Sequence, residues 1–149
     1  ISGHRTAFGK RYVWWVRDNL RLEDMEAVMQ SYVGFHDFAS FADKRRERDL
    51  STMVMVSACE INHFDDLIVI RITASHFLWK MVRRIVGVTV EAGRGNLRLE
   101  EIRGMLENIS DVPARYTAPP SGLFLERVLY EGDALASLNR PFFPFRAQC

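Results

Sequence analysis

The feature that most constrains the fold is the segment ASHFLWKMVRRIVGVTVEAGRG, residues 74–95. Apolar residues cover most of it, and their spacing predicts a helix over residues 76–92 that is buried on most sides. Gly93 is placed to end this helix in a left-handed cap. A chain with this segment must build its core around one largely buried helix.

Three cations lie in the middle of that apolar segment: Lys80, Arg83 and Arg84. Residues three and four apart share a face of a helix, so we expect the three side chains to lie together as a narrow cationic strip. They could reach solvent along their apolar stems, and this alternative is stronger for Lys80 and Arg84. Arg83 has the most apolar neighbours, and a buried guanidinium needs an anion and hydrogen bonds. The missing anion could be a phosphate, or a carboxylate from elsewhere.

The remaining segments mix helical and strand periodicity. Residues 52–61 and 67–74 are expected to pair as a hairpin whose turn, within 62–66, is slightly longer than two residues. The run LIVI at the start of 67–74 is apolar on both faces, so this strand is expected to lie inside a sheet. The sequence predicts further strands over 10–16 and 123–130, and further helices over 22–33 and 99–108. Helices mixed with a mainly antiparallel sheet place the chain in the α+β class.

Length and composition fit one globular domain. The chain has 149 residues, of which 48% are hydrophobic, and no apolar run is long enough to span a bilayer. Cys59 and Cys149 do not make a disulfide framework, and Cys59 is expected to be a reduced core thiol, which suits a cytosolic protein. No Cys/His spacing resembles a metal site. The chain begins at Ile1 without a Met, which hints at a fragment.

The net charge is only +1, so any nucleic-acid partner would have to meet local basic faces. Residues 42–49, ADKRRERD, carry four bases and three acids. The ordinary interpretation of such a run is a solvated loop. His36 and Asp37 resemble an acid/base pair, but Asp37 is favoured as a structural residue that holds a turn. Of the three tryptophans, core packing is favoured over stacking on bases.

Four collinear stretches resemble one family, the TruA-type tRNA pseudouridine synthases. The most specific is FLWKMVRRIVGVTVEAGRGNL, which is similar to the family pattern F-x-x-x-M-V-R-x-I-V-G-x-x-x-E-x-G. The stretch VGFHDFASF resembles G-x-x-D-F-x-S-F, TAPPSGLFLERVLY resembles T-A-P-x-x-G-L-x-L, and NLRLEDMEAVM resembles an L-D-x-x-x-M helix. The resemblance covers about residues 10–130. It implies a domain over residues 1–132 with the fold of the C-terminal half of a pseudouridine synthase, and a tail over 133–149.

The resemblance also implies a function. The family isomerises uridine to pseudouridine in the tRNA anticodon arm, as cytoplasmic homodimers that use no cofactor and no metal. Its nucleophile is an Asp in an R-T-D-x-G motif of the N-terminal half. Arg83 matches the arginine that forms a salt bridge with that Asp, and Leu123 matches a leucine that packs in the active site. The anion expected for Arg83 is therefore a carboxylate outside this sequence, and the chain alone is expected to be inactive.

Elementary electrostatics supports that role for Arg83. A carboxylate in a pocket that stacks a base tends to become protonated, because desolvation disfavours its charge. A fixed guanidinium opposes this shift and keeps the nucleophile anionic. The target base would have to leave its RNA stack to reach such a site.

The remaining cations near these motifs are candidates for RNA contacts. The predicted RNA-binding residues are His76, Lys80, Arg84 and, in the charge run, Arg45, Arg46 and Arg48. For His76 a packed or capping role is the stronger alternative. In HRTAFG, Ala7 stands where R-T-D-x-G has its Asp, and we treat that echo as coincidence; Tyr12 is a weak substitute for the family's catalytic Tyr. The alternative function is a catalytically inactive tRNA-binding or dimerisation module of the same fold.

Overall fold

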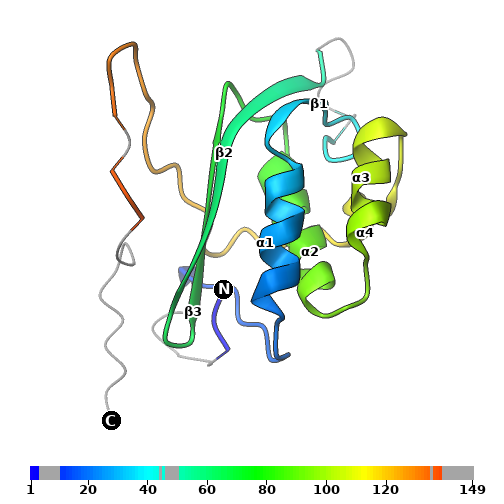
Figure 1. Cartoon of the computed structure of the whole chain (residues 1–149), viewed down its shortest axis with the longest axis vertical. Helices are drawn as coiled ribbons and strands as arrows, with labels where there is room; N and C mark the ends of the chain where they lie inside the picture. The colour runs from blue at the N-terminus through cyan, green and yellow to red at the C-terminus, as the bar shows by residue number, and fades with distance from the viewer. Residues whose placement is uncertain (4–10, 44, 46–50, 135, 139–149) are drawn as a thin grey trace.

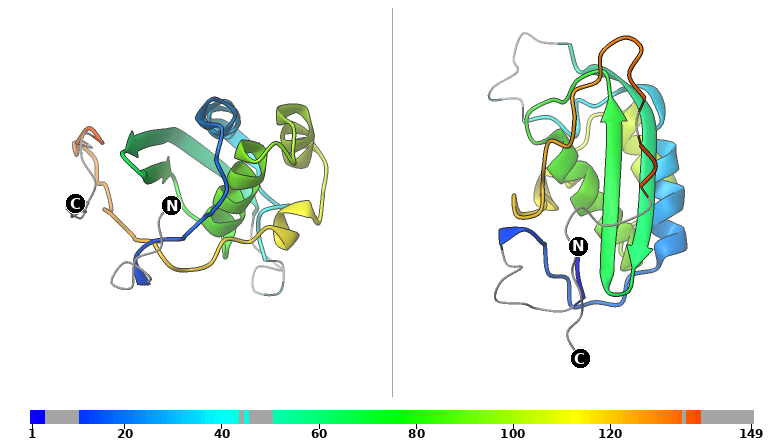
Figure 2. Two further views of the ribbon diagram at one scale, coloured as in Figure 1. Left: turned by 90° about the horizontal axis from the view of Figure 1, so that it is seen from below. Right: turned by 90° about the vertical axis from the view of Figure 1, so that its left-hand side faces the viewer.

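A computed structural model describes residues 1–3, 11–43, 45, 51–134 and 136–138 of the chain (Figure 1). Three antiparallel strands form one sheet in the order β1-β2-β3, and the helices cover one of its faces (Figures 1 and 2). This arrangement confirms the predicted α+β class. The elements are α1 (Leu22–Ser31), β1 (Gly34–Asp37), β2 (Met53–Phe64), β3 (Leu67–Ala74), α2 (Met81–Gly93), α3 (Leu99–Glu107) and α4 (Val112–Arg115).

The hairpin of β2 and β3 forms as predicted, but its turn is tighter than expected. Phe64 pairs directly with Leu67, which leaves only Asp65 and Asp66 in the turn. Asp65 has a φ of 51°, and Asp tolerates this left-handed conformation better than most residues. The prediction of a longer turn was wrong because β2 continues through residues 62–64, although Asn62 and His63 are polar residues typical of turns.

The sequence predicts that β3 lies inside the sheet, but in the sheet of the described residues β3 is an edge strand. Its alternate residues Ile70 and Ile72 pack against the core under the helices. The opposite face of β3 borders a groove that is described below. At the start of β3, its outer edge pairs with the N-terminus, where the Ile68 amide donates to the carbonyl oxygen of Ile1 at 2.8 Å. The second apolar face of β3 thus lines the groove, and among the described residues only the isolated bridge between Ser2 and Leu67 pairs with the outer edge of the strand.

The core lies between the sheet and helices α1, α2 and α3. Tyr32, Phe38 and Phe41 cluster there, with ring centroids 5.5–6.3 Å apart. Asp37 holds the turn that brings this cluster together, because its Oδ1 accepts hydrogen bonds from the Ala39 amide at 2.9 Å and the Thr52 hydroxyl at 2.6 Å. The structural interpretation of Asp37 is thus confirmed. Residues buried around the aromatic cluster include Val28, Met29, Val54, Val56, Met81, Ile85, Val88 and Ile102.

Two predicted strands are absent from the described residues. In the described part of 10–16, only an isolated bridge between Trp15 and Ser2 has strand pairing, and residues 123–130 have none. Both segments are rich in aromatic and β-branched residues, but such residues form a strand only where a partner edge is available. Here both segments border the groove instead of pairing across it.

The helix predicted over 76–92 begins only at Met81, because Lys80 has a left-handed backbone with a φ of 65°. Residues 76–80 lead into the helix as an irregular segment. The helices predicted over 22–33 and 99–108 agree with α1 and α3 to within two residues. Among the described residues, no helix has both the length and the apolar character to cross a membrane.

Candidate functional site

An open groove of about 800 Å³ lies between β3, the N-terminal end of α2 and residues 118–129. The groove is mostly apolar, and its walls include aromatic side chains of Tyr12, Phe77 and Phe124. Arg83 is one of the few cationic residues that line it, and Leu123 lines it as well. The structure thus brings together the two residues that the family resemblance assigns to an active site.

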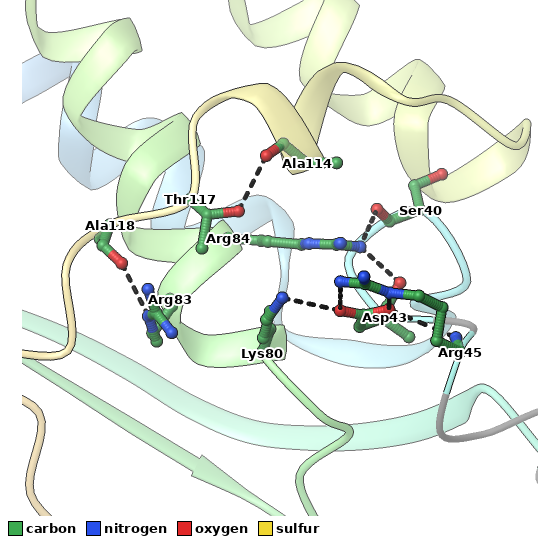
Figure 3. Close-up of polar contacts among 10 residues, drawn as sticks. Ser40, Asp43, Arg45, Lys80, Arg83, Arg84, Ala114, Thr117 and Ala118 are labelled. Carbon is green, nitrogen blue, oxygen red and sulfur yellow. Dashed lines mark hydrogen bonds and ion pairs between the residues drawn. The ribbon is translucent and has the colours of Figure 1, made fainter.

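Arg83 lies in the first turn of α2 and is half-buried. Its Nε donates a hydrogen bond to the carbonyl oxygen of Ala118 at 2.7 Å, and the Ala118 amide donates in return to the carbonyl oxygen of Arg83 at 3.0 Å (Figure 3). This pair of bonds fixes the base of the guanidinium. Within the described ranges, no carboxylate forms an ion pair with Arg83.

Gly87, one turn further along α2, explains why residues 116–118 approach so closely. A Cβ at this position would lie 1.5 Å from the carbonyl oxygen of Tyr116 and 3.2 Å from the amide nitrogen of Ala118. Only glycine lets the helix backbone and this loop come into contact. The Gly87 contact and the Arg83–Ala118 hydrogen bonds together hold the loop against α2.

Leu123 follows Gly122, whose φ of 84° makes the sharp turn that directs the chain toward β3. We call residues 119–134 the strap. At its start, the Leu123 amide donates to the carbonyl oxygen of Pro120 at 3.2 Å, and the Phe124 ring stacks on Tyr12 with centroids 6.2 Å apart. The side chain of Leu123 is 48% exposed and faces the groove. Its predicted packing in an active site stays a prediction.

The strap then passes over the sheet on the face opposite the helices (Figure 2). Arg71 of β3 anchors it there with two hydrogen bonds of 2.8 Å to the carboxylate of Glu126, and with a bond of 2.9 Å to the carbonyl oxygen of Ala136. Arg71 also contacts Glu60 at 3.2 Å. The hydrogen bonds that Arg71 donates to Glu126, above all, raise the pKa of Arg71, so the guanidinium stays charged. Nothing in the sequence singles out Arg71 as an anchor.

Lys80 and Arg84 lie on a different side of α2 from Arg83, so the three cations do not form the predicted single strip (Figure 3). The Lys80 Nζ lies 2.7 Å from Oδ2 of Asp43. The Arg84 guanidinium donates to the carbonyl oxygens of Ala42 and Ser40. Helical spacing alone could not separate Arg83 from its neighbours, because that separation depends on where residues 40–43 pack.

Asp43 is a buried, ion-paired residue that the sequence analysis did not single out. Its side chain is only 7% exposed, so the interpretation of the charge run as a solvated loop is wrong at this position. Arg45 donates to it at 3.0 and 3.1 Å. These bonds, followed by the one from Lys80, hold the pKa of Asp43 well below its ordinary value. No signal in the sequence distinguishes Asp43 from the other acids of residues 42–49.

The other predicted site residues are spread around the entrance to α2. The Arg45 side chain is 80% exposed despite its bond to Asp43. His76 is exposed, with Nδ1 3.1 Å from the Ser75 hydroxyl. Arg46 and Arg48 lie outside the described residues. At the end of α2, the Glu91 carboxylate accepts hydrogen bonds from Arg94 and Asn96.

The titratable side chains outside the groove were compared with the requirements of a metal site. In the part of the chain that the structure describes, no three His, Cys, Asp or Glu side chains are grouped so that they could hold a metal ion. Cys59 is a buried free thiol on β2. The groove with Arg83 is therefore the site to which the comparisons with known proteins apply.

A profile of the tRNA pseudouridine synthase family matches residues 28–131. Proteins described as tRNA pseudouridine synthase A are similar over most of the chain. The protein from Clostridium botulinum (strain Eklund 17B / Type B) is 34% identical over 126 residues, which are 85% of this chain and 51% of that protein.

Two further relatives give the same result. The protein from Aquifex aeolicus (strain VF5) is 36% identical over 84% of this chain and 50% of its own length. The protein from Exiguobacterium sp. (strain ATCC BAA-1283 / AT1b) is 37% identical over 83% and 50%. The chain thus spans about half the length of the curated relatives that it matches. The chain belongs to the tRNA pseudouridine synthase family, of the TruA type.

Proposed function

We propose that residues 1–132 are the C-terminal domain of a tRNA pseudouridine synthase and supply the Arg83 wall of its active site. The reaction is the isomerisation of uridine to pseudouridine in the tRNA anticodon arm, without cofactor or metal. One observation carries the proposal: Arg83, at the arginine position of the family motif, lines an apolar groove together with Leu123 and has no carboxylate partner among the described residues. The partner is the nucleophilic Asp of an R-T-D-x-G segment, which the sequence printed here does not contain.

In this proposal Arg83 acts on the charge of the nucleophile. An apolar groove that accepts a base also desolvates a carboxylate and raises its pKa. The Arg83 guanidinium, fixed by Ala118, counters this effect with a charge-assisted hydrogen bond and keeps the Asp ionised for attack on the nucleoside. Leu123 packs against the flipped nucleotide from the strap side.

We also propose where tRNA meets this domain. Arg45 and His76 present exposed side chains near the N-terminal end of α2, and Lys80 and Arg84 add positive charge behind them. Arg46 and Arg48 extend the same charge run in sequence. The whole enzyme acts in the cytoplasm as a homodimer, and residues 133–149 form a tail outside the domain.

Two assays on the 149-residue chain test this proposal. Tritium release from tRNA that carries [5-³H]uridine should be absent, because the nucleophile is not in the chain; robust turnover would refute the half-site assignment. A gel shift with tRNA at several salt concentrations should give a steep salt dependence if phosphates are contacted. Arg45→Ala should reduce the steepness of a plot of the logarithm of the binding constant against the logarithm of salt concentration by about one, whereas Arg103→Ala on the exposed face of α3 should not. Strong tRNA binding by the complete gene product with no turnover would favour the inactive RNA-binding module.

A further inference from the structure

The start of α2 poses an electrostatic problem. Its first turn contains no acid, but Lys80, Arg83 and Arg84 lie at or next to it. The N-terminal end of a helix carries partial positive charge, so cations there are unfavourable. Lys80 in addition adopts a left-handed backbone, with a φ of 65°, which is uncommon for a residue with a long side chain. Something outside the helix must stabilise this turn.

Asp43 fills that role from an adjacent loop. Its carboxylate lies 2.7 Å from the Lys80 Nζ, and its amide donates to the carbonyl oxygen of Trp79 at 3.0 Å. Asp43 therefore contacts both the backbone and the side chain of the turn that precedes α2. Its negative charge also attracts Arg84, which opposes the lowering of the Arg84 pKa by burial.

These contacts divide the three cations between two sides of the helix (Figure 3). Lys80 and Arg84, which are four residues apart and share a face, are bound to Asp43 and to the carbonyl oxygens of residues 40 and 42. The Arg83 side chain points away from Asp43, and its Nε donates a hydrogen bond to the carbonyl oxygen of Ala118. Lys80 also borders the groove, but its Nζ is bound to Asp43. A helix rotated to relieve the strain at Lys80 would carry Arg83 away from Ala118.

We propose that Asp43 is a positioning residue: through Lys80 it holds the left-handed turn that directs Arg83 into the groove. The consequence for catalysis rests on the proposed function, whereas the structural claim does not. Asp43 does not line the groove and contacts no group proposed to react.

The Nε–H of Arg83 gives a direct test in the 149-residue chain, because its NMR signal reports the bond to Ala118. In Asp43→Asn, hydrogen exchange of this proton should speed up by about tenfold, as expected when such a bond is weakened. Adding Lys80→Gly should restore slow exchange, because glycine adopts the left-handed turn without help. Asp111→Asn, which breaks the exposed ion pair with Arg115, should leave the signal unchanged.

Lys80→Gln, which removes the charge and keeps the chain length, should speed exchange as Asp43→Asn does, and it serves if Asp43→Asn does not fold. Unchanged exchange in a folded Asp43→Asn or Lys80→Gln variant would overturn the proposal. So would failure of Lys80→Gly to restore the signal, or an equal effect of Asp111→Asn.

The complete gene product separates this proposal from the proposed function. There, Asp43→Asn should lower kcat at saturating tRNA with little change in KM, whereas Asp111→Asn should leave both unchanged. If Arg83→Ala leaves turnover intact, the proposed function fails, while the NMR result still decides the role of Asp43.

Discussion

Gly87 shows how a single missing side chain fixes the site. The helix backbone at Gly87 touches the carbonyl of Tyr116, and the same loop supplies the Ala118 carbonyl that binds Arg83. Backbone atoms cannot move aside as the end of a flexible side chain can. The position of the Ala118 carbonyl that binds Arg83 therefore depends on the absence of a side chain at residue 87.

Gly87→Ala should destabilise the chain even though alanine favours helices. The gain in helix propensity is about 1 kcal/mol, but overpacking against a fixed backbone costs more, so we expect a net loss of about 2 kcal/mol in the free energy of unfolding. Gly104 in α3 is the matched control, because nothing lies within 4 Å of a Cβ there. Gly104→Ala should add about 0.5–1 kcal/mol. Urea titrations measure both, and stabilisation by Gly87→Ala would contradict the close approach.

Cys59 allows a prediction about pH. Burial raises the pKa of its thiol to about 12 from an ordinary value near 9. The unfolded chain therefore releases this proton above about pH 9 while the folded chain keeps it. Between about pH 9 and 12 the free energy of unfolding should fall by up to ~1.4 kcal/mol per pH unit from this group, and the slope should be shallower in Cys59→Ala.

Alkylation checks the burial of Cys59 directly. In a Cys149→Ser background, iodoacetamide at pH 8 should modify Cys59 only after denaturant is added, because the reactive species is the thiolate. Equal rates with and without denaturant would show that the thiol is accessible in the folded chain.

At the scale of the element, the strap depends on one strand residue. Residues 123–130 have no regular secondary structure and are exposed, and Arg71 binds them through Glu126. Removing Arg71 also leaves the carboxylates of Glu60 and Glu126 facing each other. We therefore expect the position of the strap, including Leu123, to depend on the ion pairs of Arg71 with Glu60 and Glu126 on the sheet face opposite the helices.

Arg71→Ala should release the strap. We expect chymotrypsin to cleave between residues 123 and 130 about fivefold faster, which corresponds to ~1 kcal/mol for a partly exposed charged hydrogen-bond cluster. Arg127→Ala is the control, since the polar contacts of Arg127 among the described residues stay within the strap: 3.9 Å to the Asp133 carboxylate and 3.4 Å to the carbonyl oxygen of Ala134. Identical cleavage of the two variants would mean that Arg71 does not anchor the strap.

The elements also show what sequence can predict. α1, α3 and the β2–β3 hairpin follow from apolar periodicity, which is a local signal. The late start of α2 depends on the left-handed Lys80, and this conformation is stabilised by Asp43 from a distant position. The two strands predicted near the groove fail because a strand also needs a partner edge.

For the site, the family motifs place Arg83 and Leu123, and both line the groove. Asp43 and Arg71 could not be predicted, since each acts through contacts between residues far apart in sequence. The same limit applies to the cationic strip, which the fold divides between two sides of α2.

At the scale of the molecule, the two faces of the sheet are covered differently. Helices cover one side of the sheet, whereas the groove beside β3 exposes apolar side chains and Arg83. A mostly apolar groove with a few polar groups is characteristic of a binding site. It fits the proposal that a second segment, which bears the Asp nucleophile, completes the site.

The measurement that tests the central claim most directly is tritium release from [5-³H]uridine tRNA by the protein expressed from its complete reading frame. Arg83→Ala should reduce kcat about a hundredfold or more, as loss of a fixed charge partner at a reacting group does, while tRNA binding persists. Arg103→Ala controls for the loss of an exposed cation. Turnover within about twofold of the wild type in a folded Arg83→Ala variant would contradict the account.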